Sequence, residues 1–295
     1  MWNRVVLLVA GVALGWNVVN YLVAPAERAR RHRTVAIVAA LAGLGMAAWL
    51  VPTSGAGGLL LALFVLLATA LVAYAGHARE ASKVDEPLPR ALPPRPEVAD
   101  PRVALLLVAD GDPRTYDGPG PWARRLRRCE AAGRPTPHWF ARPWALARIR
   151  AAYARLAPTE TAEGWLGGVA AALGQALGSG YAAEAVMLSG APSLASTLSR
   201  LAEAGHRRVL LAPVAGEDAL PDLLRGEITR SRVRELGVQV TVLPSGPDAA
   251  LSARLDGRLQ ALLCGQDPAP LTDLAAPLVA GLAAAVRAAL PADTG

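Results

Sequence analysis

The stretch from Ala183 to Val214, AEAVMLSGAPSLASTLSRLAEAGHRRVLLAPV, decides the fold of the larger part of this chain. It opens with an apolar run typical of a buried strand, Ala183 to Leu188, and closes with another, Arg207 to Val214. Between them, Ser193 to Ala204 has the periodicity of a helix, which ends at the glycine and histidine 205–206. Two strands joined by one helix are typical of a parallel sheet.

The same alternation continues on both sides of this stretch. Further strands are predicted at 102–109 and 238–243, and helices at 122–132, 145–156, 163–177, 218–236, 248–264 and 271–290. The last helix is apolar, but it carries Asp273 and Arg287, so we expect it to pack on the domain surface and not to span a membrane. The prediction is an α/β domain over residues 102–295, with a four-stranded parallel doubly wound sheet.

The N-terminal quarter has a different composition. Three apolar stretches, Val5–Ala24, Val35–Val51 and Gly58–Ala75, approach or exceed the length that crosses a ~30 Å hydrocarbon core as a helix. We therefore predict a three-helix transmembrane anchor over residues 1–78 and a proline-rich linker over 79–101, which holds six prolines from Pro87 to Pro101. A multi-pass protein of the inner or plasma membrane is expected, with lipid as one partner.

Charge predicts the orientation of this anchor. The connection between the first two spans carries arginines 28, 30, 31 and 33, whereas the connection 52–57 carries no charge. Short arginine-rich loops stay in the cytoplasm, which places the N-terminus outside and the soluble domain in the cytoplasm. Asn17 and Asn20 in the first span are expected near the interface or in interhelical hydrogen bonds.

Composition excludes several classes of function. The formal charge of +6 comes almost wholly from arginine, without an RNA-binding motif, so no nucleic-acid partner is expected. Cys129 and Cys264 are far apart and have no CxxC or histidine partner, which indicates reduced thiols and no metal site.

The strand ends and turns resemble the N-terminal half of the ferrochelatase family. ALLLVADGDPRTYDG (104–118) is similar to that family's opening strand and turn, and VMLSGAPSLASTLSRLAEAGHRRVLLAPVAGE (186–217) to its next strand, helix and strand. The resemblance covers about Arg102 to Leu263. It implies a chelatase-like fold, porphyrin or heme as ligand, and, if active, a lyase that inserts a metal into a porphyrin.

The departures from that family affect the expected function. Ferrochelatases have two similar halves with the porphyrin between them, whereas this chain has one, and the metal-handling histidine motif of the second half has no counterpart. We therefore expect tetrapyrrole binding or handling with a degenerate site, and we assign no catalytic residue. A homodimer would complete the cleft. The alternative is a non-catalytic assembly or interaction module that binds a membrane-protein partner.

The candidate ligand-binding residues follow from the expected crevice at the carboxyl ends of the strands. Asp110, Gly111 and Asp112 follow the first strand, Ser189 and Gly190 the second, and Glu217 the third. Each acid also has a structural interpretation, as a turn former or, at 217–218, a helix cap. Trp139 and Arg142 lie in an aromatic segment that either stacks on a carboxylated macrocycle or docks on the membrane surface.

Overall fold

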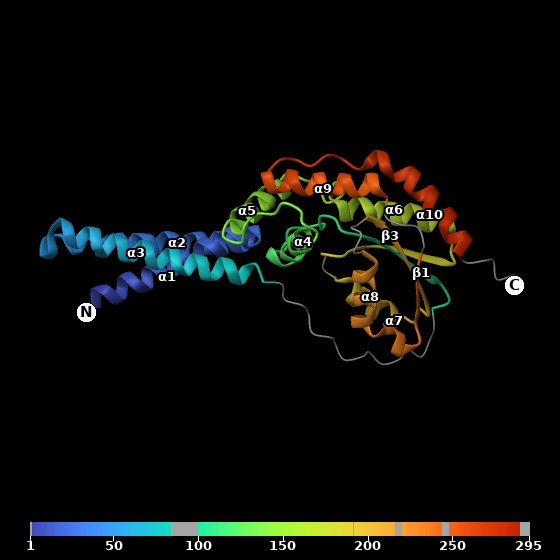
Figure 1. Ribbon diagram of the computed structural model, residues 1–295, viewed down its shortest axis with the longest axis horizontal. Helices are drawn as coiled ribbons and strands as arrows, with labels where there is room; N and C mark the ends of the chain where they lie inside the picture. Colours follow the sequence, from blue (N-terminus) through green and yellow to red (C-terminus); the bar gives the residue numbers. More distant parts are fainter. Residues whose placement is uncertain (1, 84–99, 191, 216–219, 244–247, 290–295) are drawn as a thin grey trace. The chain divides into compact units, whose positions relative to one another are not determined.

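The computed structural model describes residues 2–83, 100–190, 192–215, 220–243 and 248–289 (Figure 1). The chain divides into two compact units. The bundle unit consists of residues 1–85, 116–154 and 263–265, and the sheet unit of residues 86–115, 155–262 and 266–295. The polypeptide therefore passes between the units several times, and residues 116–154 group with the N-terminal helices and not with the sheet of the predicted soluble domain.

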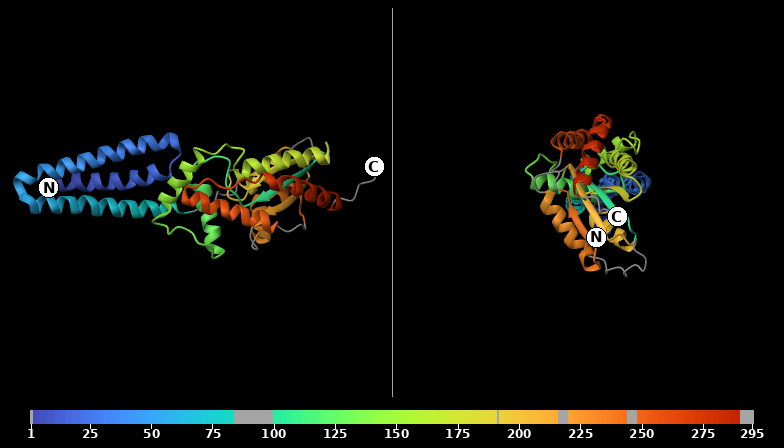
Figure 2. Two further views of the ribbon diagram at one scale, coloured as in Figure 1. Left: turned by 90° about the horizontal axis from the view of Figure 1, so that it is seen from above. Right: turned by 90° about the vertical axis from the view of Figure 1, so that its right-hand side faces the viewer.

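Three long apolar helices make up most of the bundle unit: α1 (Trp2–Val23), α2 (Ala26–Trp49) and α3 (Val51–Ala81), which lie side by side (Figure 2). Glycine lets α1 and α3 approach closely, because a Cβ atom on Gly15 would lie 2.1 Å from the carbonyl oxygen of Ala70. All three helices are long and apolar enough to cross a membrane, and a fourth helix of the chain, at 272–289, also meets this criterion.

The connections between these helices differ from the prediction. The arginine-rich segment expected to be a loop is helical, because α2 begins at Ala26, directly after Pro25. Arginine is a good helix former, and a proline next to the first turn is compatible with a helix start. The uncharged connection at 52–57 is likewise part of α3, which is kinked at Gly55, where φ is 64°.

Two shorter helices, α4 (Pro119–Ala131) and α5 (Arg142–Tyr153), complete the bundle unit. Arg150 of α5 donates hydrogen bonds to the carbonyl oxygens of Tyr21 and Ala24, at 2.6 and 2.8 Å. Tyr116 donates its hydroxyl to the carbonyl oxygen of Val23 at 2.9 Å, and burial raises the pKa of this phenol, so the donor keeps its proton. These contacts satisfy carbonyl groups that the end of α1 leaves without helical partners.

The sheet unit contains the predicted four-stranded parallel sheet. Its strands are β1 (Val103–Ala109), β2 (Tyr181–Met187), β3 (Arg208–Ala215) and β4 (Gln239–Val242), in the order β2-β1-β3-β4. Buried parallel strands are continuous apolar runs, which is why β1 and β3 are recognisable from sequence.

Helices cover both faces of this sheet (Figure 1). Leu105 and Leu107 of β1 contribute to a core with α6 (Ala162–Leu177), α9 (Ala249–Cys264) and α10 (Ala275–Ala289). Leu106 and Val108 contribute to the opposite core with α7 (Leu194–Glu203) and α8 (Leu220–Ser231). This arrangement confirms the doubly wound α/β class.

Two helices of the sheet unit are shorter than predicted. The helix expected over 218–236 ends at Ser231, because Arg232 adopts a left-handed conformation with φ of 54° and a 3-10 turn, η1 (Val233–Leu236), follows. The final helix begins at Ala275, after the turn η2 (Thr272–Leu274). Val286 of α10 is fully buried in the core that α6 shares, so this helix packs on the sheet unit.

Candidate functional site

The carboxyl edge of the sheet brings two of the predicted site residues together. The hydroxyl of Ser189, just after β2, donates to the Asp110 carboxylate, just after β1, at 2.8 Å. The amide of Gly190 donates to the carbonyl oxygen of Met187 at 2.9 Å, which closes the turn that holds Ser189 in place. This edge of the sheet therefore carries a hydrogen-bonded pair of an acid and a hydroxyl.

Asp112 has a structural partner instead. Its carboxylate accepts two hydrogen bonds from the guanidinium of Arg258 in α9, both at 3.0 Å, and one from the amide of Ala162, also at 3.0 Å. Both side chains of this ion pair are almost completely buried, at 0% and 1% exposed. The neighbouring Gly111 is packed so tightly that a Cβ atom there would lie 2.7 Å from the Cβ of Ala162.

The aromatic segment belongs to the bundle unit. Arg142 forms an ion pair with Glu130 and donates through Nε to the carbonyl oxygen of Pro137 at 3.2 Å, so its guanidinium holds the connection between α4 and α5. Phe140, next to Trp139, packs edge-on against Tyr74 of α3, with ring centroids 4.8 Å apart. Asp110 and Ser189 lie in the other unit, and the predicted residue Glu217 lies outside the described residues.

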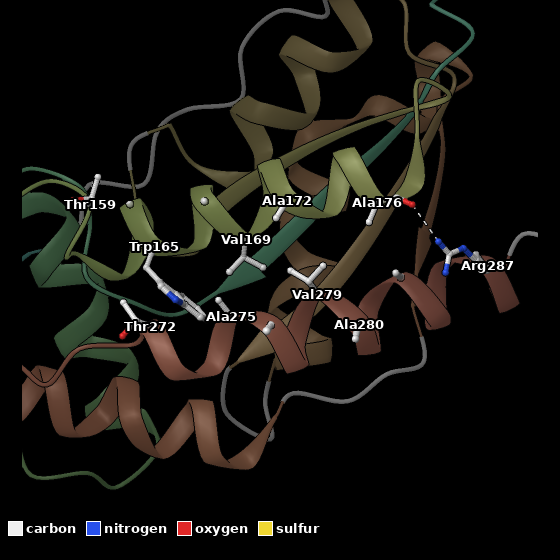
Figure 3. A pocket seen from close by; sticks show the side chains of 14 residues that line it. Thr159, Trp165, Val169, Ala172, Ala176, Thr272, Ala275, Val279, Ala280 and Arg287 are labelled. Carbon is white, nitrogen blue, oxygen red and sulfur yellow. Dashed lines mark hydrogen bonds between the residues drawn. The ribbon is translucent and has the colours of Figure 1, made fainter.

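A groove of about 860 Å³ runs between α6 and α10 on the surface of the sheet unit (Figure 3). Its floor and walls are mostly small and apolar: Gly164, Gly168, Val169, Ala172, Ala176, Ala275, Ala276, Val279, Ala280 and Ala283. The volume is in the range of small-molecule pockets, ~300–1,000 Å³. A flat apolar ligand can approach the backbone of both helices here, since few side chains project into the groove.

Polar groups stand at the two ends of this groove. Arg287 lines one end, where its guanidinium donates to the carbonyl oxygen of Ala176 at 3.1 Å (Figure 3). At the other end are two threonines and Trp165, whose indole N–H is buried and has no acceptor among the described residues. A ligand with an apolar body and an acidic group therefore matches the chemistry of the groove.

The groove was not predicted, although the sequence of α6 carries a signal for one of its walls. Glycine or alanine recurs every four residues in α6, at 164, 168, 172 and 176. This spacing puts the small residues on one face of a helix, but the helix that faces them lies about 100 residues later and cannot be identified from periodicity alone.

Within the described part of the chain, no three His, Cys, Asp or Glu side chains are grouped so as to hold a metal ion. In comparisons with known proteins, no family model, no curated protein and no solved structure matches the chain.

Proposed function

We propose that this chain is a membrane-anchored protein that binds a tetrapyrrole in the groove between α6 and α10. The observation that carries the proposal is the groove itself, an apolar slot with Arg287 at one end. The ligand class comes from the resemblance of residues 102–263 to ferrochelatases, and the four-stranded parallel sheet is compatible with it. No catalytic residue is assigned, and the protein acts as a carrier or sensor.

The chemistry of a porphyrin suits this groove. The macrocycle is flat and apolar, and its carboxylates lie on one edge of the ring. Glycine and alanine on both helices leave room for the ring, while Arg287 pairs with a carboxylate at one end of the groove.

The anchor consists of α1, α2 and α3, with the N-terminus outside and the sheet unit in the cytoplasm. The arginines near the start of α2 support this orientation. A reporter enzyme fused after Gly295 is expected to be active only if it functions in the cytoplasm. Activity of a reporter that requires the opposite compartment would contradict the orientation.

The test is a titration of the full-length protein in detergent micelles with protoporphyrin, followed by absorbance and by quenching of tryptophan fluorescence. Saturable binding is expected, with a weaker affinity for Arg287→Gln and for Ala280→Phe, which fills the groove. Arg225→Gln, an exposed arginine on α8, is the matched control and should bind as the wild type does. Binding that is unaffected by both groove variants would refute the site, and no binding at all would refute the ligand class.

Adding ferrous iron to the bound complex distinguishes a carrier from an enzyme. Binding without conversion to the metalloporphyrin is expected. Conversion above the rate without protein would instead establish a chelatase activity.

One observation favours a second function, an interaction module for a partner helix. Alanines 276, 280, 284 and 288 form an exposed stripe along α10, and small residues at this spacing allow close helix packing. In that case Ala280→Phe would dissociate an oligomer or a membrane complex, measured by light scattering of the solubilised protein, while porphyrin would not bind.

A further inference from the structure

Four half-buried polar side chains form a cluster among α1, α2 and α3. Asn17 and Asn20 come from α1, His32 from α2 and His77 from α3. Polar and ionisable side chains within apolar helices of this length are costly, and they face one another where they occur. The expected interhelical hydrogen bonds of the two asparagines are present, and their partners are the two histidines.

The hydrogen bonds of Asn17 define the proton positions on His32. The amide nitrogen of Asn17 donates to the carbonyl oxygen of Ala13 at 2.8 Å, so its side-chain oxygen faces Nδ1 of His32 at 3.0 Å. An amide oxygen only accepts, and therefore Nδ1 of His32 carries the proton. The lone pair of this neutral imidazole is then on Nε2.

His77 is held in a similar way with the nitrogens exchanged. Its Nε2 donates to the side-chain oxygen of Asn20 at 2.9 Å, and its Nδ1 is buried without a partner among the described residues. The ring of Trp16 stacks on His77 with a centroid distance of 3.8 Å and an interplanar angle of 19°. The ring is thus fixed by an amide and an indole, and it has one unused lone pair.

Histidines that bind metals have this arrangement. One ring nitrogen donates to an oxygen that orients the ring, and the other nitrogen keeps its lone pair for the metal. Asn17 and Asn20 are three residues apart and lie on one face of α1, so the two imidazoles that bond to them lie on the same side of this helix. Two neutral imidazoles on neighbouring helices are the donors that copper, nickel and zinc ions prefer.

We propose that His32 and His77 together bind one divalent transition-metal ion at this position in the bundle. No third His, Cys, Asp or Glu joins them among the described residues, so water or an exogenous ligand completes the coordination. The site is independent of the groove between α6 and α10, and it does not require a tetrapyrrole.

The experiment uses Cu²⁺ as the probe and the full-length protein in detergent, without a histidine tag. All proteins carry Cys264→Ser, because this exposed thiol would bind copper by itself. Calorimetry is expected to give one Cu²⁺ per chain, and electron paramagnetic resonance a hyperfine pattern from two imidazole nitrogens. His32→Gln and His77→Gln should each weaken binding at least tenfold and leave one nitrogen. His138→Gln, in the connection between α4 and α5, is the matched control and should leave binding unchanged.

Melting curves distinguish a variant that has lost the metal site from one that has failed to fold. Cu²⁺ is expected to raise the melting temperature of the wild type and of His138→Gln, but not that of His32→Gln. If His77→Gln fails to fold, His32→Gln is sufficient, because His32 is only half-buried at the side of the bundle. No saturable binding by the wild type, or undiminished binding by the folded His32→Gln protein, would overturn the proposal.

Discussion

Replacing Arg258 by methionine should destabilise the sheet unit strongly. The guanidinium of Arg258 neutralises the fully buried carboxylate of Asp112 and also donates to the carbonyl oxygens of Ala269, at 2.5 Å, and Glu160, at 2.8 Å. Among the described residues, Arg258→Met leaves the buried carboxylate with one hydrogen bond, from the amide of Ala162. Breaking a buried ion pair in this way costs about 3–5 kcal/mol.

Hydrogen exchange of peptides from β1 and β3 is the suitable assay, because it reports on the sheet unit separately from the bundle unit. A loss of about 3–5 kcal/mol corresponds to exchange that is about two to four orders of magnitude faster where it requires global opening, since ~1.4 kcal/mol is a factor of ten. The double variant Asp112→Leu with Arg258→Met should recover much of the loss, because an apolar pair replaces the buried charges.

A matched control lies one turn earlier on α9. Arg254 pairs with Asp273 at 3.3 Å, and both side chains are exposed. Exposed ion pairs contribute about 0–1 kcal/mol, so Arg254→Met should change the exchange rates less than about tenfold. If Arg258→Met also changed them less than about tenfold, the buried pair would not hold the unit together as described.

Three further predictions concern other parts of the chain. Arg150→Ala should destabilise the bundle unit by about 2–3 kcal/mol, since the carbonyl groups of Tyr21 and Ala24 at the end of α1 lose a charged donor. Arg127→Ala, at an exposed position, should not destabilise it, and equal melting temperatures of the two variants in detergent would count against this contact. Gly15→Ala should lower the melting temperature of the bundle, because the added Cβ meets the backbone of α3. At Gly45 a Cβ has nothing within 4 Å, so Gly45→Ala should be neutral or stabilising. A lower melting temperature for Gly45→Ala than for Gly15→Ala would disprove the close packing. Hydrogen bonds from Arg102 lower the pKa of Asp100 from 3.8 to about 2, so the contribution of Asp100 to stability is complete above pH 3.8 and is lost as the pH falls through about 2. The free energy of unfolding should therefore fall less between pH 5 and pH 2 in Asp100→Asn than in the wild type. An identical pH dependence of the two proteins would contradict this.

Local sequence signals predicted the elements of this fold well. The strands 102–109 and 207–214 were predicted within one residue of β1 and β3, because buried parallel strands are uninterrupted apolar runs between glycine and proline turns. The arginine-rich start of α2 was wrongly predicted as a loop. Its charged residues were taken to mark the connection between two apolar spans, although arginine also favours helices.

Pairings between distant segments were not accessible in the same way. The sequence made Asp112 a candidate ligand-binding residue. Only the tertiary structure shows that its carboxylate is paired with Arg258, 146 residues later in the chain. The proximity of Asp110 and Ser189 was inferable, since both follow neighbouring parallel strands. The small residues of α6 mark one wall of the groove, but neither its second wall on α10 nor the capping of α1 by Arg150 has a local signature, because each depends on two helices meeting in space.

The membership of α4 and α5 in the bundle unit has a consequence for biosynthesis. The ribosome completes β1 before it makes residues 116–154, and β2 follows only afterwards. The bundle therefore lacks the donor that caps α1 until Arg150 has emerged. Throughout that interval the apolar strand β1 has no strand to pair with, because β2 has not yet been made. For the same reason, a fragment cut at Arg102 would carry α5 without the helix on which it packs, so truncated soluble versions of this protein should aggregate unless residues 116–154 are removed as well.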